Sequence, residues 1–115
     1  MVKDAIGIID LGLEGFSVAQ SFAQNFRHEH IIYHNEMLHH SYLNITENEV
    51  QEIVKTMIKR LLTFNPKLIV VANDLIIDLA APVLEDLEIP VLNPIQVLID
   101  YLNINYEQKN IVLLA

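Results

Sequence analysis

The chain has 115 residues, a net charge of −8 and no cysteine. The missing thiols exclude disulfides, thiolate metal sites and cysteine nucleophiles, and the acidic balance argues against nucleic-acid binding, which needs clustered Lys and Arg. No apolar run is long enough for a membrane span or a signal-peptide core. We therefore expect a cytoplasmic protein that forms one domain over residues 1–115.

The first half of the chain alternates short apolar runs with helical periods. Strands are expected at 5–9 and 30–33, with a helix at 15–26 between them. The clearest helix covers 47–63, where apolar residues recur at the i, i+3, i+4, i+7 spacing of an amphipathic helix. Thr46 and Glu49 form the capping-box pattern that starts such a helix.

The same alternation continues in the middle of the chain. Residues 67–71 and 89–92 are short apolar runs that predict strands. The segment between them predicts a helix over 75–87, which Pro82 kinks or restarts.

The last part of the chain predicts one more helix and one more strand. Asn93 and Pro94 have the residue types of a helix cap and a first helical position. The spacing of the apolar residues predicts that four side chains of this helix face inward: Ile95, Leu98, Ile99 and Leu102. A fifth strand is expected at 110–114.

Five strands alternating with four helices predict an α/β fold, a three-layer α/β/α domain with a parallel sheet. Right-handed crossovers make a flavodoxin-like strand order, 2-1-3-4-5, the leading topology. Ligands of such sheets bind at the carboxyl ends of the strands. The loops 10–15, 34–44 and 73–75 are expected to surround one crevice there.

Several short motifs resemble the first half of the glutamate racemases, in the Asp/Glu racemase family. I-G-I-I-D-L-G-L-E-G at 6–15 resembles the family's opening motif with D-S-G-x-G-G, and V-A-N-D-L at 71–75 resembles its V-A-C-N-T. Further similarities are H-I-I-Y at 30–33, S-Y-L at 41–43 and I-P-V at 89–91. The resemblance implies one lobe of the racemase fold.

In that family two thiols, one from each half, exchange the Cα proton of glutamate or aspartate without a cofactor. The resemblance places Asn73 where the first thiol stands, and an amide is neither a proton donor of that kind nor a usable base. Asp10 matches the aspartate that assists the thiol. The resemblance assigns ligand-binding positions to Leu11, Gly12, Tyr42, Asn73, Asp74 and Leu75.

The resemblance thus implies a truncated, degenerate racemase-like lobe that lacks cysteine-based racemisation. Such a lobe is expected to bind a small dicarboxylate, an amino acid or a protein through the old cleft. The surface on which the family's second half packs predicts a homodimer or packing on a second lobe. No cofactor is expected.

Two other interpretations stay open. In the first, the chain is an active racemase, isomerase or lyase with a rebuilt site. Its catalytic residues are then Asp10, Asp74 and His34, with His34 as the general acid/base. Alternatively, it is an excised lobe of a longer racemase-like protein.

Two further patterns are weaker. Five histidines fall between 28 and 40, but their spacing matches no metal motif, and we expect surface histidines and no metal site. The glycines at 12 and 15 are too few for a phosphate cradle and indicate a tight turn from strand to helix.

Overall fold

The computed structural model describes residues 4–12, 15–36, 45–110 and 112. These residues form four strands and five helices. In chain order the elements are β1 (Ala5–Asp10), α1 (Phe16–Asn25), β2 (Ile31–Asn35), α2 (Glu47–Leu62), β3 (Pro66–Val71), α3 (Asp74–Leu79), α4 (Ala81–Glu85), β4 (Val91–Leu92) and α5 (Pro94–Asn105).

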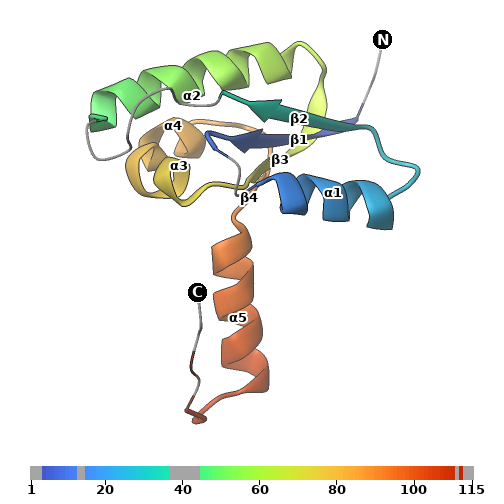
Figure 1. Cartoon of the computed structure of the whole chain (residues 1–115), viewed down its shortest axis with the longest axis vertical. Coiled ribbons are helices and arrows are strands. Elements are labelled where there is room, and N and C mark those ends of the chain that lie inside the picture. Colours follow the sequence, from blue (N-terminus) through green and yellow to red (C-terminus); the bar gives the residue numbers. More distant parts are fainter. Residues whose placement is uncertain (1–3, 13–14, 37–44, 111, 113–115) are drawn as a thin grey trace.

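The four strands form one parallel sheet in the order β2-β1-β3-β4 (Figure 1). This order confirms the predicted topology for the first four strands. The expectation of five strands is wrong for the described residues. Most of the predicted strand at 110–114 lies outside them, and Asn110 and Val112, which are described, belong to no strand.

Helices cover both faces of the sheet, as the α/β/α prediction requires. On one face α1 packs through Ala19 against Ile6 and Ile8 of β1 and Val70 of β3. On the other face α2 and α3 enclose the larger core, in which the buried residues are Ile9, Leu11, Val50, Val54, Met57, Ile58, Leu61, Ile69, Val71, Ile76 and Ala80. Burial on both faces explains why the strands read as continuous apolar runs.

The predicted helix at 47–63 is confirmed as α2. The Thr46 hydroxyl accepts a hydrogen bond from the Glu49 backbone N–H at 3.1 Å and so caps the first turn. The predicted helix at 75–87 is divided into α3 and α4. Pro82 lies in the first turn of α4, where its missing N–H leaves no intrahelical bond unmade.

The helix predicted from Pro94 is present as α5, but of the side chains predicted to face inward Leu102 is only partly buried and two others are exposed. Leu98 and Ile99 are 43% and 44% exposed. Figure 1 shows α5 projecting away from the sheet, beyond the short strand β4. The apolar pattern correctly predicted a helix, but no other helix or strand of the described residues packs on the exposed side chains; Tyr106, Lys109, Asn110 and Val112, which follow α5 in the chain, line a groove with Tyr101 and Leu102.

Among the described residues, no helix combines the length and the apolar character that crossing a bilayer requires.

Candidate functional site

Asp10, at the carboxyl end of β1, is a fully buried carboxylate. Its Oδ1 accepts hydrogen bonds from the backbone N–H groups of Leu11 at 2.8 Å and Gly12 at 3.1 Å. Its Oδ2 accepts from the Gly15 N–H at 2.8 Å. A buried carboxylate is stable only when donors replace its lost water, and here the loop that leads from β1 to α1 supplies three of them.

Two side chains complete this shell. The Tyr33 hydroxyl donates to Asp10 Oδ2 at 2.7 Å, and Asn73 Nδ2 lies 3.2 Å from Asp10 Oδ1. Asp10 therefore joins β1, β2 and the start of α3 in a single network, which we call the Asp10 network: Asp10, Leu11, Gly12, Gly15, Tyr33, Asn35 and Asn73.

Asn35 extends the network from β2. Its Nδ2 donates to the Gly12 carbonyl and to the Tyr33 hydroxyl oxygen, the latter at 3.1 Å. Its Oδ1 is buried and has no hydrogen-bond partner among the described residues. This oxygen is an acceptor that a water or a ligand donor would satisfy.

Asn73 uses both ends of its amide. While Nδ2 faces Asp10, Oδ1 accepts from the backbone N–H groups of Leu75 at 2.9 Å and Ile76 at 3.3 Å. Asn73 is thus the N-cap of α3, and it is only 4% exposed. These hydrogen bonds hold the start of the helix and the carboxylate beside it.

Gly15 is required by close packing rather than by its backbone angles. A Cβ atom at this position would lie 2.6 Å from Asp10 Oδ2 and 2.6 Å from the Ala72 Cβ. Any side chain here would push the carboxylate out of its shell, so the glycine lets α1 begin against the Asp10 network.

Among the predicted ligand-binding residues, Leu11 is fully buried in the core shared with α2 and α3, and Leu75 packs against the same core. Gly12 is buried in the loop after β1 and contributes its backbone N–H to Asp10. Tyr42 lies outside the described residues. The side chains of Leu11 and Leu75 therefore contribute apolar packing in this structure.

The three predicted catalytic residues do not come together. Asp74 is exposed in the first turn of α3, where the helix dipole favours a negative charge. His34 pairs with Ile9 in the sheet and lies on the opposite face of β2 from Tyr33, because neighbouring strand residues point to opposite faces. Asp10 is enclosed by its donors.

His34 belongs to a different polar group on the α2 side of the sheet. Its Nε2 lies 3.5 Å from Glu36 Oε2, and the same carboxylate oxygen lies 3.5 Å from the Arg60 guanidinium of α2. His39 and His40 lie outside the described residues. Within the described ranges, no three His, Cys, Asp or Glu side chains gather in a metal-binding arrangement.

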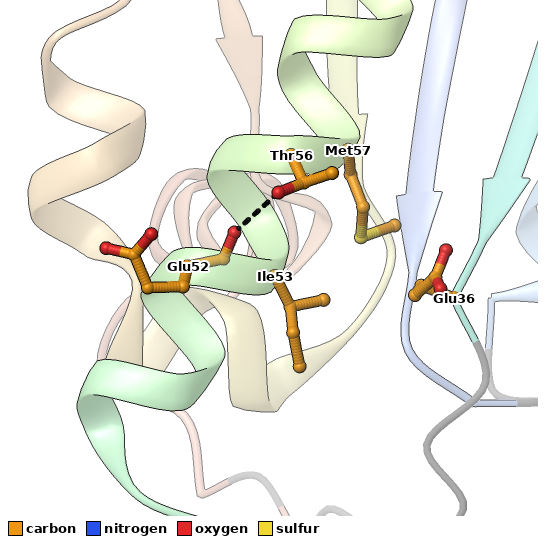
Figure 2. A pocket seen from close by; sticks show the side chains of 5 residues that line it. All are labelled: Glu36, Glu52, Ile53, Thr56 and Met57. Atoms are coloured by element: carbon orange, nitrogen blue, oxygen red, sulfur yellow. Dashed lines mark hydrogen bonds between the residues drawn. The ribbon is translucent and has the colours of Figure 1, made fainter.

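A cavity of about 230 Å³ opens between the end of β2 and α2 (Figure 2). Ile53 and Met57 provide apolar lining, and Glu36 faces them from the strand side. Glu52 and Thr56 complete the lining, and the Thr56 hydroxyl donates to the Glu52 carbonyl at 3.0 Å. None of these residues belongs to the Asp10 network.

Tyr33 and Asn35 were not predicted as site residues. The signal that would have found them is the two-residue alternation of the strand: both lie on the same face of β2, and Asn35 pairs with Asp10 across the sheet. The capping role of Asn73 also had a signal, since Asn before a helical segment is a favoured N-cap.

No family model matches the chain. It is 30% identical over 67 residues to the glutamate racemase of Bifidobacterium adolescentis, covering 58% of this chain and 26% of that protein. It is 35% identical over 68 residues to the glutamate racemase of Exiguobacterium sibiricum, covering 59% and 25%. The chain spans about a quarter of the length of these relatives.

The fold is similar to that of a glutamate racemase isoform from Bacillus anthracis, with a TM-score of 0.68 and 31% sequence identity. That match covers 78% of this chain and 34% of the solved one. Together with the sequence matches, it confirms the predicted resemblance. The chain contains a partial glutamate racemase-like domain.

Proposed function

We propose that this glutamate racemase-like domain does not racemise amino acids and acts instead by binding another protein. The observation that carries the proposal is the Asp10 network. Asp10 and Asn73, which the resemblance places at the catalytic end of the lobe, are buried and hold each other and the surrounding backbone in place.

The first argument concerns the proton transfer. Two-thiol racemisation needs a thiolate at the position of Asn73, and the chain has no cysteine. An amide cannot abstract a Cα proton. The described contacts of Asn73 are those of a helix cap, which supports a structural role at this position.

The second argument concerns small dicarboxylates and amino acids. An anionic ligand at this crevice would need free donors or cations. The backbone N–H groups of Leu11, Gly12 and Gly15 already donate to Asp10. The described residues of the network include no Lys or Arg, and the Asp10 carboxylate would repel a second anion.

The third argument concerns protein contacts. Large apolar side chains are exposed on α5, the most exposed being Ile104 at 79%. A large contiguous apolar patch that is exposed on a soluble domain commonly marks an interaction site. A protein partner therefore fits the described surface better than a small anion fits the crevice.

The rebuilt active site remains the alternative. It requires Asp10, Asp74 and His34 to act on one substrate, and the described geometry weighs against it because Asp10 is enclosed and His34 lies on the other face of β2. If this alternative holds, His34→Ala abolishes turnover and leaves the fold intact.

The proposal is tested by proton exchange. The protein is incubated in D₂O with L- and D-glutamate and with L- and D-aspartate, and loss of the Cα proton signal is followed by NMR. A full-length glutamate racemase serves as the positive control. We expect no exchange above the protein-free background and no amide shifts at Asp10, Gly12 or Asn73 at millimolar ligand. Protein-dependent exchange overturns the proposal, and shifts confined to this crevice restore amino-acid binding as its function.

A further inference from the structure

A groove of about 380 Å³ lies between α2 (Glu47–Leu62) and the segment 82–87, which includes most of α4. The α2 side of the groove is formed by residues that recur every three or four positions: Gln51, Lys55, Ile58, Lys59 and Leu62. This spacing places them along one side of the helix. They extend over about 16 Å, so the groove follows α2 for about three turns.

The base of the groove is apolar and its two sides are held together. Ile58 and Leu62 line it from α2, and Val83 and Leu87 line it from the α4 side and pack against the larger core. At the first turns of α2, Gln51 Nε2 donates to the Leu79 carbonyl at the end of α3 at 3.0 Å. Because α3 leads directly into α4, this hydrogen bond keeps the two sides at a fixed separation.

The charge of the groove is opposite to that of the chain. The chain has 15 acidic and 7 basic side chains, yet the groove is lined by two lysines, Lys55 and Lys59, and by one carboxylate, Asp86. The cavity at the other flank of α2 has the reverse pattern, since its charged lining residues are Glu36 and Glu52 (Figure 2). The groove is therefore a local site of positive charge on an acidic protein.

Both lysines are available to a ligand. Lys59 is exposed and forms no ion pair within the part of the chain that the structure describes. Lys55 lies 3.2 Å from Glu52, but both side chains are mostly exposed, and such surface pairs contribute little to stability. The flexible four-carbon stems let the ammonium groups move to meet a carboxylate.

The length and charge of the groove favour a peptide as its ligand. An anionic membrane surface is recognised by clusters of about four to eight Lys and Arg, and two lysines are too few. A groove between two helices with an apolar base is the surface on which an amphipathic helix binds, with apolar side chains at i, i+3 or i+4, and i+7. Such a helix also carries polar residues along its flank, where carboxylates can face the lysines.

We propose that this groove binds an acidic amphipathic segment of a partner protein. Apolar side chains of the segment contact Ile58, Leu62, Val83 and Leu87, and its carboxylates face Lys55 and Lys59. Asp86 repels a carboxylate on the α4 side, so the acidic flank of the segment lies toward α2. The proposal rests on the proposed function in that the ligand is a protein, and it assigns that ligand a surface separate from α5.

Selection of peptides from a random phage-displayed library on the full chain tests the charge of the ligand. A chain with a net charge of −8 by itself attracts basic peptides. We expect enriched peptides to be acidic with two or more large apolar residues. A synthetic copy of the most enriched peptide should shift amide NMR signals of 51–62 and 82–87. Enrichment of basic peptides, or shifts mainly outside the groove, overturns the proposal.

Charge reversal tests the lysines with that same peptide. Lys59→Glu should raise its dissociation constant about tenfold, because an attraction becomes a repulsion. Lys109→Glu makes the same change in net charge at another exposed lysine, outside the groove, and should change the dissociation constant by less than about twofold. Equal effects of the two variants would show that only the net charge of the chain matters and would overturn the proposal.

A second pair of variants tests the apolar base. Leu62→Ser should weaken binding about fivefold or more, whereas Phe64→Ser should leave it unchanged, since Phe64 has nearly the same exposure, 43% against 44%, but does not line the groove. Thermal unfolding verifies that each variant is folded. Equal losses at the two positions overturn the assignment of the groove.

Titration with octanoate separates a peptide site from a site for small carboxylates. We expect octanoate to shift the signals of the groove only at concentrations far above those of the peptide. Octanoate binding as tight as that of the peptide overturns the protein partner. None of these results depends on the proton-exchange assay, so failure of the groove and failure of the proposed function are separate outcomes.

Discussion

Two regions of this domain, the carboxyl end of β1 and the helix α5, differ in how far their side chains are buried and paired. At the carboxyl end of β1, a buried carboxylate is surrounded by five donors. On α5, apolar side chains lie open to water. At the first place the carboxylate is satisfied and only the Asn35 Oδ1 acceptor has no partner among the described residues, while at the second several large apolar side chains are exposed. Our proposal that the lobe binds a protein and does not racemise amino acids rests on this difference, and substitutions in the two regions can test it.

The largest effect is expected for Asp10→Ala. Removing the carboxylate leaves several buried donors without an acceptor, including the Gly15 N–H and the Tyr33 hydroxyl. Each such donor is costly, so the free energy of unfolding should fall by about 3 kcal/mol or more. Urea denaturation measures it, with the exposed Asp74→Ala as control. Equal losses for the two variants would show that the Asp10 network contributes no special stability.

Gly15→Ala should cause the second-largest loss of stability. The added Cβ would lie 2.6 Å from Asp10 Oδ2, and overpacking of this kind costs about 1–3 kcal/mol. Gly7→Ala is the matched control, because its Cβ would meet the Leu61 side chain at 3.2 Å, where a flexible methyl can move. If thermal unfolding shows Gly7→Ala to be the more damaging variant, the Gly15 packing argument fails.

Asn73→Ala removes a helix cap and one donor to Asp10. We expect a loss of about 1–2 kcal/mol in chemical denaturation. Thr46→Ala removes the cap of α2 alone and should cost less, since no buried carboxylate depends on it. A smaller effect at Asn73 than at Thr46 would contradict the structural role of the Asn73 amide.

The smallest effect on stability belongs to Ile104→Glu. Because Ile104 is 79% exposed, the unfolding free energy of the dilute monomer should change by less than about 0.5 kcal/mol. Met57→Ala, in the core under α2, should instead cost about 2–5 kcal/mol. A large loss at Ile104 in the monomer would mean that α5 packs on its own domain.

Much of the fold could be predicted because local signals agreed. The apolar runs predicted β1 to β4, and the cap at Thr46 with its amphipathic spacing predicted α2. The break at Pro82 was also anticipated. The surroundings of α5 could not be predicted, because periodicity identifies an apolar side of a helix but not what lies against it.

The candidate site was harder to predict. The resemblance drew attention to Asn73 as a lost thiol, while its hydrogen bonds are those of a cap. Asp10 was predicted at the crevice, but its shell also includes donors from Tyr33 and Asn73, which are distant in sequence. Tyr33 and Asn35 reach it only once the β1–β2 register is known.

The short strand β4 also bears on how the protein resists aggregation. β4 forms one edge of the sheet, and its two residues, Val91 and Leu92, are apolar. Such an edge could pair with strands of other molecules and seed fibrils. Pro90 and Pro94 stand close on either side, and proline has no N–H to donate to a neighbouring strand. The two prolines limit β4 to two residues, so this edge of the described sheet offers little backbone for pairing with a strand of another molecule.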